Sequence, residues 1–414
     1  MSVLPVTTDA PGVALHRRVF ERPSSPGDRR RWLRSGAAGL SGPFGGPAAL
    51  PAVSLATTLI ALEREITAAT PDRPGTRPGI VELLGERAAV QGWRRSGRRS
   101  LGGVTRLVPA ADGWLAIALA RPDDIASIPA WLGTTDVDQG VGRRCVASLV
   151  AAGAELGLAV AGLGEVTPAD GPAFVVGPGV SRRPLARWAD VTVVDLSSLW
   201  AGPLCTSLLG SLGARVIKVE STRRPDGARR GPPVLFDLLH VGQESVAFDF
   251  DAAEDRRRLR ALIAHADVVV EASRPRALAQ IGVDAEAFVR HGIVWLSITG
   301  HGRRQPMRVA FGDDAAVAGG LVTGGADRPW FCADAVADPL SGVLGAAAII
   351  DRLTAGVSGL IDLSMAAAAA WAGRSGPDDD PVVDAAPPRI RPSGGPAPAL
   401  GADTVRVLRE LGIG

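Results

Sequence analysis

The sequence predicts an α/β protein built on a parallel β-sheet with helices on both of its faces. Two observations lead to this fold class. The chain has 414 residues, 46% of them hydrophobic and 21% charged, which suits a protein of two or three domains with a sizeable core. From residue 191 onward, short runs of β-branched residues alternate with segments of helical character. This strand–helix–strand repetition is typical of parallel sheets.

The first half of the chain predicts elements in a less regular order. Apolar residues at helical spacing predict a helix over 53–70. An Asp-Gly turn followed by alternation predicts a strand over 111–119. Residues 145–163 predict an amphipathic helix, a glycine break and a short strand. Residues 164–190 are rich in Gly, Pro and Arg, so we expect a connection between domains there.

The second half predicts the parallel sheet. A helix that ends in glycine is expected over 202–214, directly after the first strand. The strands of the sheet are expected over 191–197, 215–220, 266–273 and 293–300.

Both ends of the chain are expected to be less compact. The first 30 residues or so are rich in Pro, Arg and Ser and are expected to be loose, and "GPDDDP" and "GGPAPA" mark an extended linker near the other end. A short helix is expected over 402–411. The predicted divisions are an N-terminal region at 1–185, the parallel-sheet domain at 186–372, the linker at 373–399 and the C-terminal helix at 400–414.

Composition limits the partners. The net charge is only +2, so no global field points to nucleic acid. Lys218 is the single lysine, and arginine, whose planar fork suits phosphate, carries the remaining positive charge. Three scattered cysteines, Cys145, Cys205 and Cys332, predict neither disulfides nor a metal site. We see no signal-like segment and no uncharged run of membrane-spanning length, so we expect a cytoplasmic protein without a membrane partner.

One turn is the strongest candidate for ligand binding. Small residues there let backbone N–H groups approach a ligand, and the N-terminus of the following helix favours an anion. The pattern is not GxGxxG, so support for a dinucleotide is weak. The residues of this turn are Leu199, Trp200, Ala201, Gly202 and Pro203.

Two acidic residues each have two interpretations. Asp338 and Pro339 precede a long apolar run, and because Asp is a favoured N-cap and Pro suits the first helical position, they could simply begin a helix. The Asp338 carboxylate could instead be a reactive group. Glu220, at the end of a strand, could receive a ribose hydroxyl, although a solvated strand end is the interpretation that we favour.

Seven phrases of the sequence resemble, in the same order, the class III (CaiB/BaiF-type) CoA-transferase family. The similarity covers about 190–372 and 394–414. The phrases are "DLSSLWAGPLCTSLLGSLGARVIKVE", "ESVAFDF", "ADVVVEASRPRALAQIG", "VWLSITGHG", "VADPLSGVLGAAAIIDRL", "GLIDLSMAAAAAWAG" and "GGPAPALGADTVRVLRELG".

The resemblance implies a Rossmann-like catalytic domain at 186–372 and a smaller α+β domain. Family members normally place the small domain after the segment that resembles "IDLSM", whereas here 102–119 and 151–166 resemble small-domain pieces and lie in front. The chain is therefore expected to be a rearranged or fused variant. The resemblance also implies an interlocked homodimer, in which the linker at 373–399 would cross the neighbouring chain.

The resemblance places Asp338 at the catalytic aspartate of the family. Its carboxylate would attack an acyl-CoA thioester, form a mixed anhydride and release CoA, before a carboxylic acid acceptor exchanges in. Arg274 matches a position near CoA, against the alternative of a solvated turn, and CoA is also expected at Leu199–Pro203. Acyl-CoA and the acceptor would be substrates, and no permanently bound cofactor and no metal are expected.

Basic residues that the family usually has before the strand at 246–250 are missing. This chain has His240, Val241, Gly242 and Gln243 there, so two phosphate-binding cations are absent. Four arginines could substitute, although a solvated arginine loop is more common; they are Arg223, Arg224, Arg229 and Arg230.

Related α-methylacyl-CoA racemases use a histidine where this chain has Phe311 and Gly312. His301 lies ten residues earlier in a Gly-His-Gly loop and is expected to be structural. Asp313 and Asp314 could act as a base, but a capping or surface role is expected. Three functions follow: an acyl-CoA:carboxylate CoA-transferase, an acyl-CoA racemase or isomerase on the same fold, and a non-catalytic acyl-CoA-binding paralogue.

Overall fold

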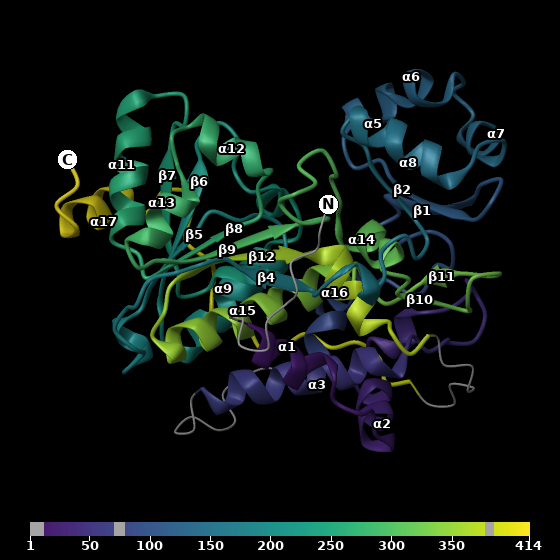
Figure 1. Ribbon diagram of the computed structural model, residues 1–414, viewed down its shortest axis with the longest axis horizontal. Helices are drawn as coiled ribbons and strands as arrows, with labels where there is room; N and C mark the ends of the chain where they lie inside the picture. Colours follow the sequence, from purple (N-terminus) through teal and green to yellow (C-terminus); the bar gives the residue numbers. More distant parts are fainter. Residues whose placement is uncertain (1–11, 70–78, 377–384) are drawn as a thin grey trace.

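The structure is a computed structural model that describes residues 12–69, 79–376 and 385–414. Its centre is a seven-stranded sheet in the order β4-β12-β9-β8-β5-β6-β7 (Figure 1). The strands are β4 (Phe174–Val176), β5 (Thr192–Asp195), β6 (Arg215–Ser221), β7 (Glu244–Phe248), β8 (Val268–Glu271), β9 (Val294–Thr299) and β12 (Gly359–Ser364).

Six of these strands are parallel, and β4 alone pairs antiparallel, at the edge beside β12. Counted along the chain from β5, the parallel strands have the order 3-2-1-4-5-6, which is the Rossmann order. The strand order reverses between β5 and β8. The α/β fold class with a parallel-rich sheet is therefore confirmed.

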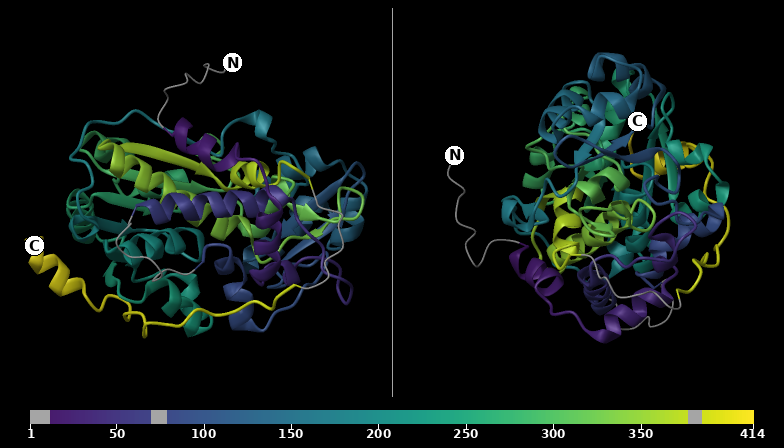
Figure 2. Two further views of the ribbon diagram at one scale, coloured as in Figure 1. Left: turned by 90° about the horizontal axis from the view of Figure 1, so that it is seen from below. Right: turned by 90° about the vertical axis from the view of Figure 1, so that its right-hand side faces the viewer.

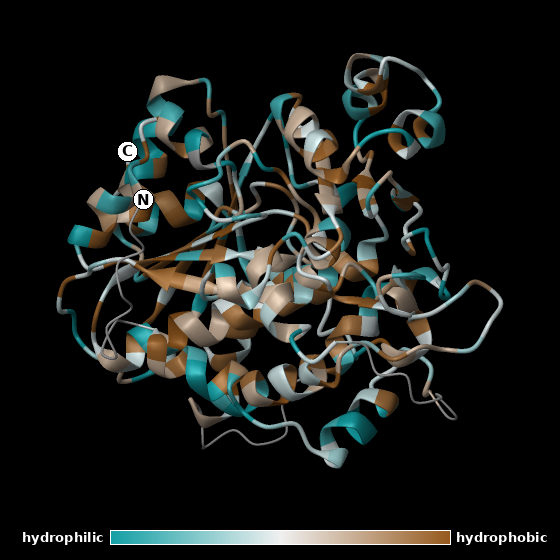
Figure 3. Cartoon of the chain, turned by 45° about the vertical axis from the view of Figure 1, so that its right-hand side comes forward, coloured by the Kyte–Doolittle hydropathy of each residue, from teal (hydrophilic) through white to brown (hydrophobic). Residues whose placement is uncertain are grey.

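Helices cover both faces of the sheet, and Figure 3 shows hydrophobic colour concentrated in the strands and the helices against them. One face of the sheet packs against α9 (Ala201–Leu212), α15 (Ala337–Ala355) and α16 (Met365–Ala372). The apolar residues of these helices form one large hydrophobic cluster with those of β5, β8 and β9. The other face is covered by α11 (Ala253–Ala264), α12 (Pro275–Gln280), α13 (Ala285–Arg290) and α17 (Thr404–Glu410).

Part of the N-terminal region forms an additional layer outside α15 (Figure 1). Its helices are α1 (Val13–Phe20), α2 (Pro26–Arg34) and α3 (Val53–Ala68). The expectation that the first 30 residues are loose is wrong from residue 13 onward, because Leu15, Val19 and Phe20 are buried in the main core. Residues 1–11 lie outside the described residues.

A smaller α+β domain, also in the N-terminal region, sits beside the large sheet (Figure 1). Its antiparallel sheet consists of β1 (Thr105–Pro109), β2 (Trp114–Ala118) and β3 (Ala159–Gly162). Its helices are α5 (Pro122–Ala126), α6 (Ile128–Leu132), α7 (Val137–Gly142) and α8 (Val146–Glu155). The sheet rests on α14 (Gly312–Ala318), and the N–H groups of Gly164 and Val166 donate to the carbonyls of Val317 and Ala318.

Three short segments complete the secondary structure near the acids discussed below. They are α4 (Glu86–Gln91), α10 (Pro233–His240) and the hairpin of β10 (Val322–Thr323) and β11 (Trp330–Phe331). Within the described ranges, no helix combines the length and the apolar character that a membrane span requires.

Residues 385–399 of the predicted linker run along the outside of this same chain (Figure 2). Ala386 N donates to Leu33 O at 2.9 Å, and Arg391 Nη2 donates to Leu238 O at 2.8 Å. The helix that follows docks on β7, where Asp403 accepts from Ser245 N. The segment therefore crosses the N-terminal helices of its own chain, and the homodimer stays a prediction.

Candidate active site

The predicted CoA turn lies at the carboxyl ends of the parallel strands. Leu199 and Trp200 follow β5, and Arg274 follows β8, where it is the N-cap of α12. These two strands flank the point at which the strand order reverses, and α/β sheets bind ligands in the crevice at that point. The structure thus brings both predicted CoA-contacting segments to one edge of the sheet.

Arg274 is exposed and faces the small domain. A Cβ added at Gly157 of that domain would lie 3.6 Å from Arg274 Nη2. No described acid forms an ion pair with Arg274, so its guanidinium stays available to an anion between the small domain and β8.

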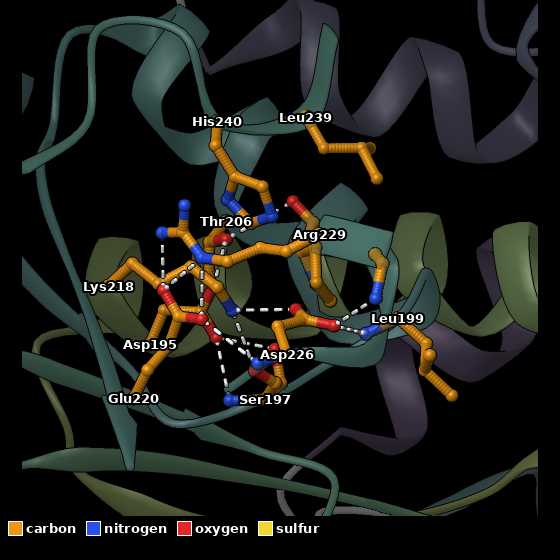
Figure 4. A network of polar contacts seen from close by, with 12 residues as sticks. Asp195, Ser197, Leu199, Thr206, Lys218, Glu220, Asp226, Arg229, Leu239 and His240 are labelled. Atoms are coloured by element: carbon orange, nitrogen blue, oxygen red, sulfur yellow. Dashed lines mark hydrogen bonds and ion pairs between the residues drawn. The ribbon is translucent and has the colours of Figure 1, made fainter. Parts of the chain in front are cut away.

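A buried polar network contacts the backbone of this turn (Figure 4). Lys218 is 1% exposed and donates to Ser197 O at 2.8 Å, while its Nζ lies 3.1 Å from Asp226 Oδ2. Burial alone would lower the pKa of Lys218, but the charges of Asp195 and Asp226 raise it above its usual value. Asp226 Oδ1 also accepts from Leu199 N at 3.0 Å. Lys218 and Asp226 therefore fix the backbone on which the turn is built.

Glu220 belongs to the same network, and the prediction of a solvated strand end is wrong. It is 4% exposed, and both of its oxygens accept from the guanidinium of Arg229, Oε1 from Nε and Oε2 from Nη2. Burial opposes ionisation, but Arg229 and the Asp226 N–H lower the pKa of Glu220. Because its oxygens are occupied, Glu220 is not free to receive a ribose hydroxyl. Arg223, in contrast, pairs with Asp249 at the exposed surface, as expected for a solvated loop.

Asp338 lies in the first turn of α15, and it is not the N-cap. The helix begins at Ala337 after the N-cap Val336, and no side chain caps it. The Asp338 N–H already donates to Ala335 O at 2.8 Å. The interpretation of Asp338 as the N-cap of this helix is therefore wrong, because its carboxylate does not cap α15 and instead accepts from Gly312 N of the neighbouring helix.

Asp338 is partly exposed, but it is crowded by protein atoms and by other acids. Burial, together with the negative charges of Asp313 and Asp334, raises the pKa of Asp338 to about 7, against the opposing effect of Arg87 and a hydrogen bond from Gly312 N. Burial and Asp334 likewise raise the pKa of Asp313 to about 6. A group with a pKa near neutrality exists in both protonation states at working pH, which is typical of functional carboxylates.

Arg87 is the cation of this acid cluster, which we define as Asp313, Asp334 and Asp338. Its Nε donates to Asp334 Oδ2 at 2.8 Å and its Nη2 to Asp334 Oδ1 at 2.6 Å. The guanidinium lies over the ring of Trp200, 4.6 Å from the centroid. Sequence reasoning missed Arg87, because nothing in its short helical segment marks it as a ligand of distant acids.

The N-terminus of α15 lies against α9, which joins the acid cluster to the predicted CoA turn. A side chain at Gly342 would collide with the carbonyl of Ala201, so glycine is required for this close approach. Three non-glycine residues with positive φ flank the two helix starts: Leu199 at 70°, Ala333 at 52° and Ala335 at 42°. Strained backbone of this kind is held by surrounding structure and clusters at functional sites.

Two further predictions for neighbouring residues can be compared with the structure. The surface role considered for Asp314 is wrong, because it is fully buried, burial raises its pKa well above the usual value, and it caps α14 by accepting from Phe311 N at 2.9 Å. His301 is buried, and burial lowers its pKa to about 3, so it is neutral. Within the described ranges, no group of three His, Cys, Asp or Glu side chains is arranged to hold a metal ion.

Comparison with known proteins agrees with the resemblance. Residues 188–379 match the family described as CoA-transferase family III. This segment belongs to the class III CoA-transferases. The class III segment contains the turn at 199–203, Arg274 and Asp338, whereas Arg87 and the small domain lie before it.

Curated relatives of the class III segment are CoA-transferases. A succinyl-CoA–D-citramalate CoA-transferase of Chloroflexus aurantiacus is 32% identical over 162 residues, which are 36% of this chain and 40% of the relative. A succinate–glutarate CoA-transferase of Agrobacterium fabrum is 30% identical over 199 residues, 42% of this chain and 50% of the relative. This chain thus spans half or less of these relatives. A CaiB/BaiF family protein from Brucella suis matches structurally with a TM-score of 0.40 and 29% identity, covering 45% of this chain and 55% of that one.

Proposed function

We propose that the protein is an acyl-CoA:carboxylate CoA-transferase that works through a covalent acyl intermediate on Asp338. The observation that carries the proposal is Asp338 itself: a partly exposed carboxylate that does not cap its own helix and has a pKa of about 7, beside the turn that follows β5. The class III segment and the named activities of its relatives support the reaction class.

The proposed chemistry needs only a carboxylate and the substrates. The Asp338 carboxylate attacks the thioester carbonyl, the C–S bond breaks, and CoA leaves as the thiolate while a mixed anhydride remains. The thiolate then attacks the Asp338 carbonyl of that anhydride, and the donor acid leaves as its carboxylate. The acceptor carboxylate displaces CoA from the resulting aspartyl thioester, and the thiolate takes the acceptor acyl group, which restores Asp338.

CoA is proposed to bind with its pantetheine or adenine end against Leu199–Pro203 and a phosphate near Arg274. The crevice at the reversal of strand order, the anion-favouring N-terminus of α9 and the unpaired guanidinium of Arg274 support this placement. Dicarboxylic acids such as succinate are the first donors and acceptors to test, because the names of the relatives contain them.

The proposal is tested by trapping the intermediate. Wild-type protein is incubated with succinyl-CoA and hydroxylamine, and peptide mass spectrometry should find a hydroxamate on Asp338. Asp338→Asn should give no hydroxamate, whereas Asp314→Asn is the matched control that alters a buried acid of the neighbouring helix. A hydroxamate on Asp334 in place of Asp338, or full transfer activity in Asp338→Asn, would overturn the assignment.

An acyl-CoA isomerase is the second candidate, and the two neighbouring acids Asp313 and Asp338 are the observation that favours it. Asp313 with a pKa of about 6 and Asp338 with a pKa of about 7 could move a proton between them and a substrate α-carbon. Incubation of acyl-CoA in heavy water without an acceptor acid separates the two: exchange of the α-proton supports the isomerase, and its absence with acyl transfer supports the transferase.

A further inference from the structure

The acid cluster receives its cation from a part of the chain outside the class III segment. Arg87 lies in α4, and Asp334, to which it donates two hydrogen bonds, lies 247 residues later. The side chain of Asp334 is 1% exposed, and that of Arg87 is 24% exposed. The pair is therefore a bidentate ion pair with one partner fully buried, which fixes the orientation of both groups.

The charges around Asp338 are unbalanced without Arg87. Asp313 and Asp314 face it from α14, and Asp334 faces it from the segment before α15. Among the described residues, no other Lys, Arg or His forms an ion pair with these acids. Removal of the guanidinium would thus leave several crowded carboxyl groups with no compensating charge, which destabilises their ionised forms.

Arg87 also touches the predicted CoA turn. Its guanidinium stacks over Trp200, in that turn, and also lies 5.5 Å from the ring centroid of Trp93. The contact with Trp200 and the two hydrogen bonds to Asp334 together hold the guanidinium in one orientation, so the direction of its donors is set in advance. One side chain therefore connects the turn, Asp334 and the surroundings of Asp338.

We propose that Arg87 is a positioning residue of the transfer reaction: it holds Asp334 in place and keeps Asp338 able to carry the negative charge with which it attacks a thioester. This inference rests on the proposed function. It also means that the N-terminal region completes the active site of the class III segment within one chain. Arg87 acts through Asp334 and Asp338, with no contact to the reacting atoms required.

The test measures the protonation of Asp338 directly, in folded full-length protein. Aspartate is labelled with ¹³C at the carboxyl carbon, and Asp338→Asn identifies the Asp338 resonance. In Arg87→Gln we expect the titration of Asp338 to move to higher pH, and each pH unit of displacement lowers its carboxylate fraction at pH 6 about tenfold. Arg87→Lys keeps the positive charge and should move the titration less.

Acyl transfer should follow the titration. In Arg87→Gln, the part of the pH profile where the rate rises should shift to higher pH. The rate of this variant should therefore recover partly at pH 9. The double variant Arg87→Gln/Asp334→Asn removes both partners and should return the limb toward that of the wild type, and it covers the outcome that the single variant unfolds. Arg391→Gln is the matched control, because it breaks the buried pair with Glu86, next to Arg87 but away from the cluster.

The outcomes separate this inference from the proposed function. A shifted Asp338 titration in a protein that shows no acyl transfer with any donor would support the effect of Arg87 on the charge of Asp338 and refute the transferase. Transfer activity with an unmoved titration, or a loss of activity that is equal at every pH, would overturn the role of Arg87. An equal shift in Arg391→Gln would also overturn it, because the effect would then be general loosening.

Discussion

Asp338→Asn should stabilise the protein at alkaline pH while abolishing its activity. The pKa of Asp338 is raised from 3.8 to about 7 in the folded state. Because the folded state then binds the proton more tightly than the unfolded chain, the stability of the wild type falls as the pH rises from about 4 to about 7. The amide has no ionisable proton, so the stability of the variant does not decline in this way.

The magnitude follows from the displacement of the pKa. A difference of about 3 pH units, at about 1.4 kcal/mol per unit, gives an upper value of about 4 kcal/mol at pH 8. At pH 5 the carboxyl of the folded protein is largely protonated, and the same relation gives a stability difference between variant and wild type of under about 2 kcal/mol. The variant should therefore gain stability relative to the wild type, and the gain should grow between pH 5 and pH 8.

Urea unfolding followed by tryptophan fluorescence measures this gain, since the chain has 9 tryptophans. Acyl transfer is assayed on the same samples and should fall by several orders of magnitude, as for the loss of a covalent nucleophile. A variant that is less stable than the wild type at pH 8, or a difference that does not change with pH, would refute the electrostatic reasoning. Retained transfer activity would refute the role of Asp338.

Four further outcomes are expected. Arg274→Ala should weaken CoA binding roughly tenfold with a smaller dependence on salt, because one charge-assisted contact is lost; unchanged affinity in calorimetry would return Arg274 to a solvated turn. Lys218→Met should destabilise the protein by about 3–5 kcal/mol, since Asp195 and Asp226 lose a buried cation, and an unchanged thermal midpoint would contradict this. Ala335→Gly should raise the unfolding free energy by about 1 kcal/mol by relieving a φ of 42°, and a loss of stability would count against strain there. Light scattering should give twice the chain mass of 42.6 kDa if the predicted homodimer forms, and a single-chain mass would remove that prediction.

Strands and helices of the parallel sheet could be predicted from the sequence because their signals are local. Continuous β-branched runs mark the buried strands β5 and β8, and glycine marks the end of α9. The turn at 199–203 was predicted from its small residues before a helix, and the resemblance added CoA as its ligand and the catalytic role of Asp338, since both lie in contiguous phrases. A smaller α+β domain was likewise expected, and the structure has one with its three strands between 105 and 162.

The remainder could not be predicted because it depends on partners far away in the chain. Glu220 was expected to be solvated, and only the fold shows that Arg229 covers it. The pairing of Arg87 with Asp334 has no local signature at either end. The helices at 13–20 and 26–34 were missed because their arginine-rich composition resembles a loose segment, while their few apolar residues pack into the main core.

The position of β4 suggests a place at which the chain could be split into two fragments that reassociate. This short strand completes the edge of the sheet beside β12, while α3 covers the outer side of α15. A cut in the connection between β4 and β5 would leave two polypeptides, each with an exposed apolar surface that fits the other. Produced separately, they should find one another as complementing fragments, and Arg87 would meet Asp334 only after they associate. The proposed acyl transfer would then report on that encounter, so the two halves could serve as a split reporter for the association of proteins that are fused to them.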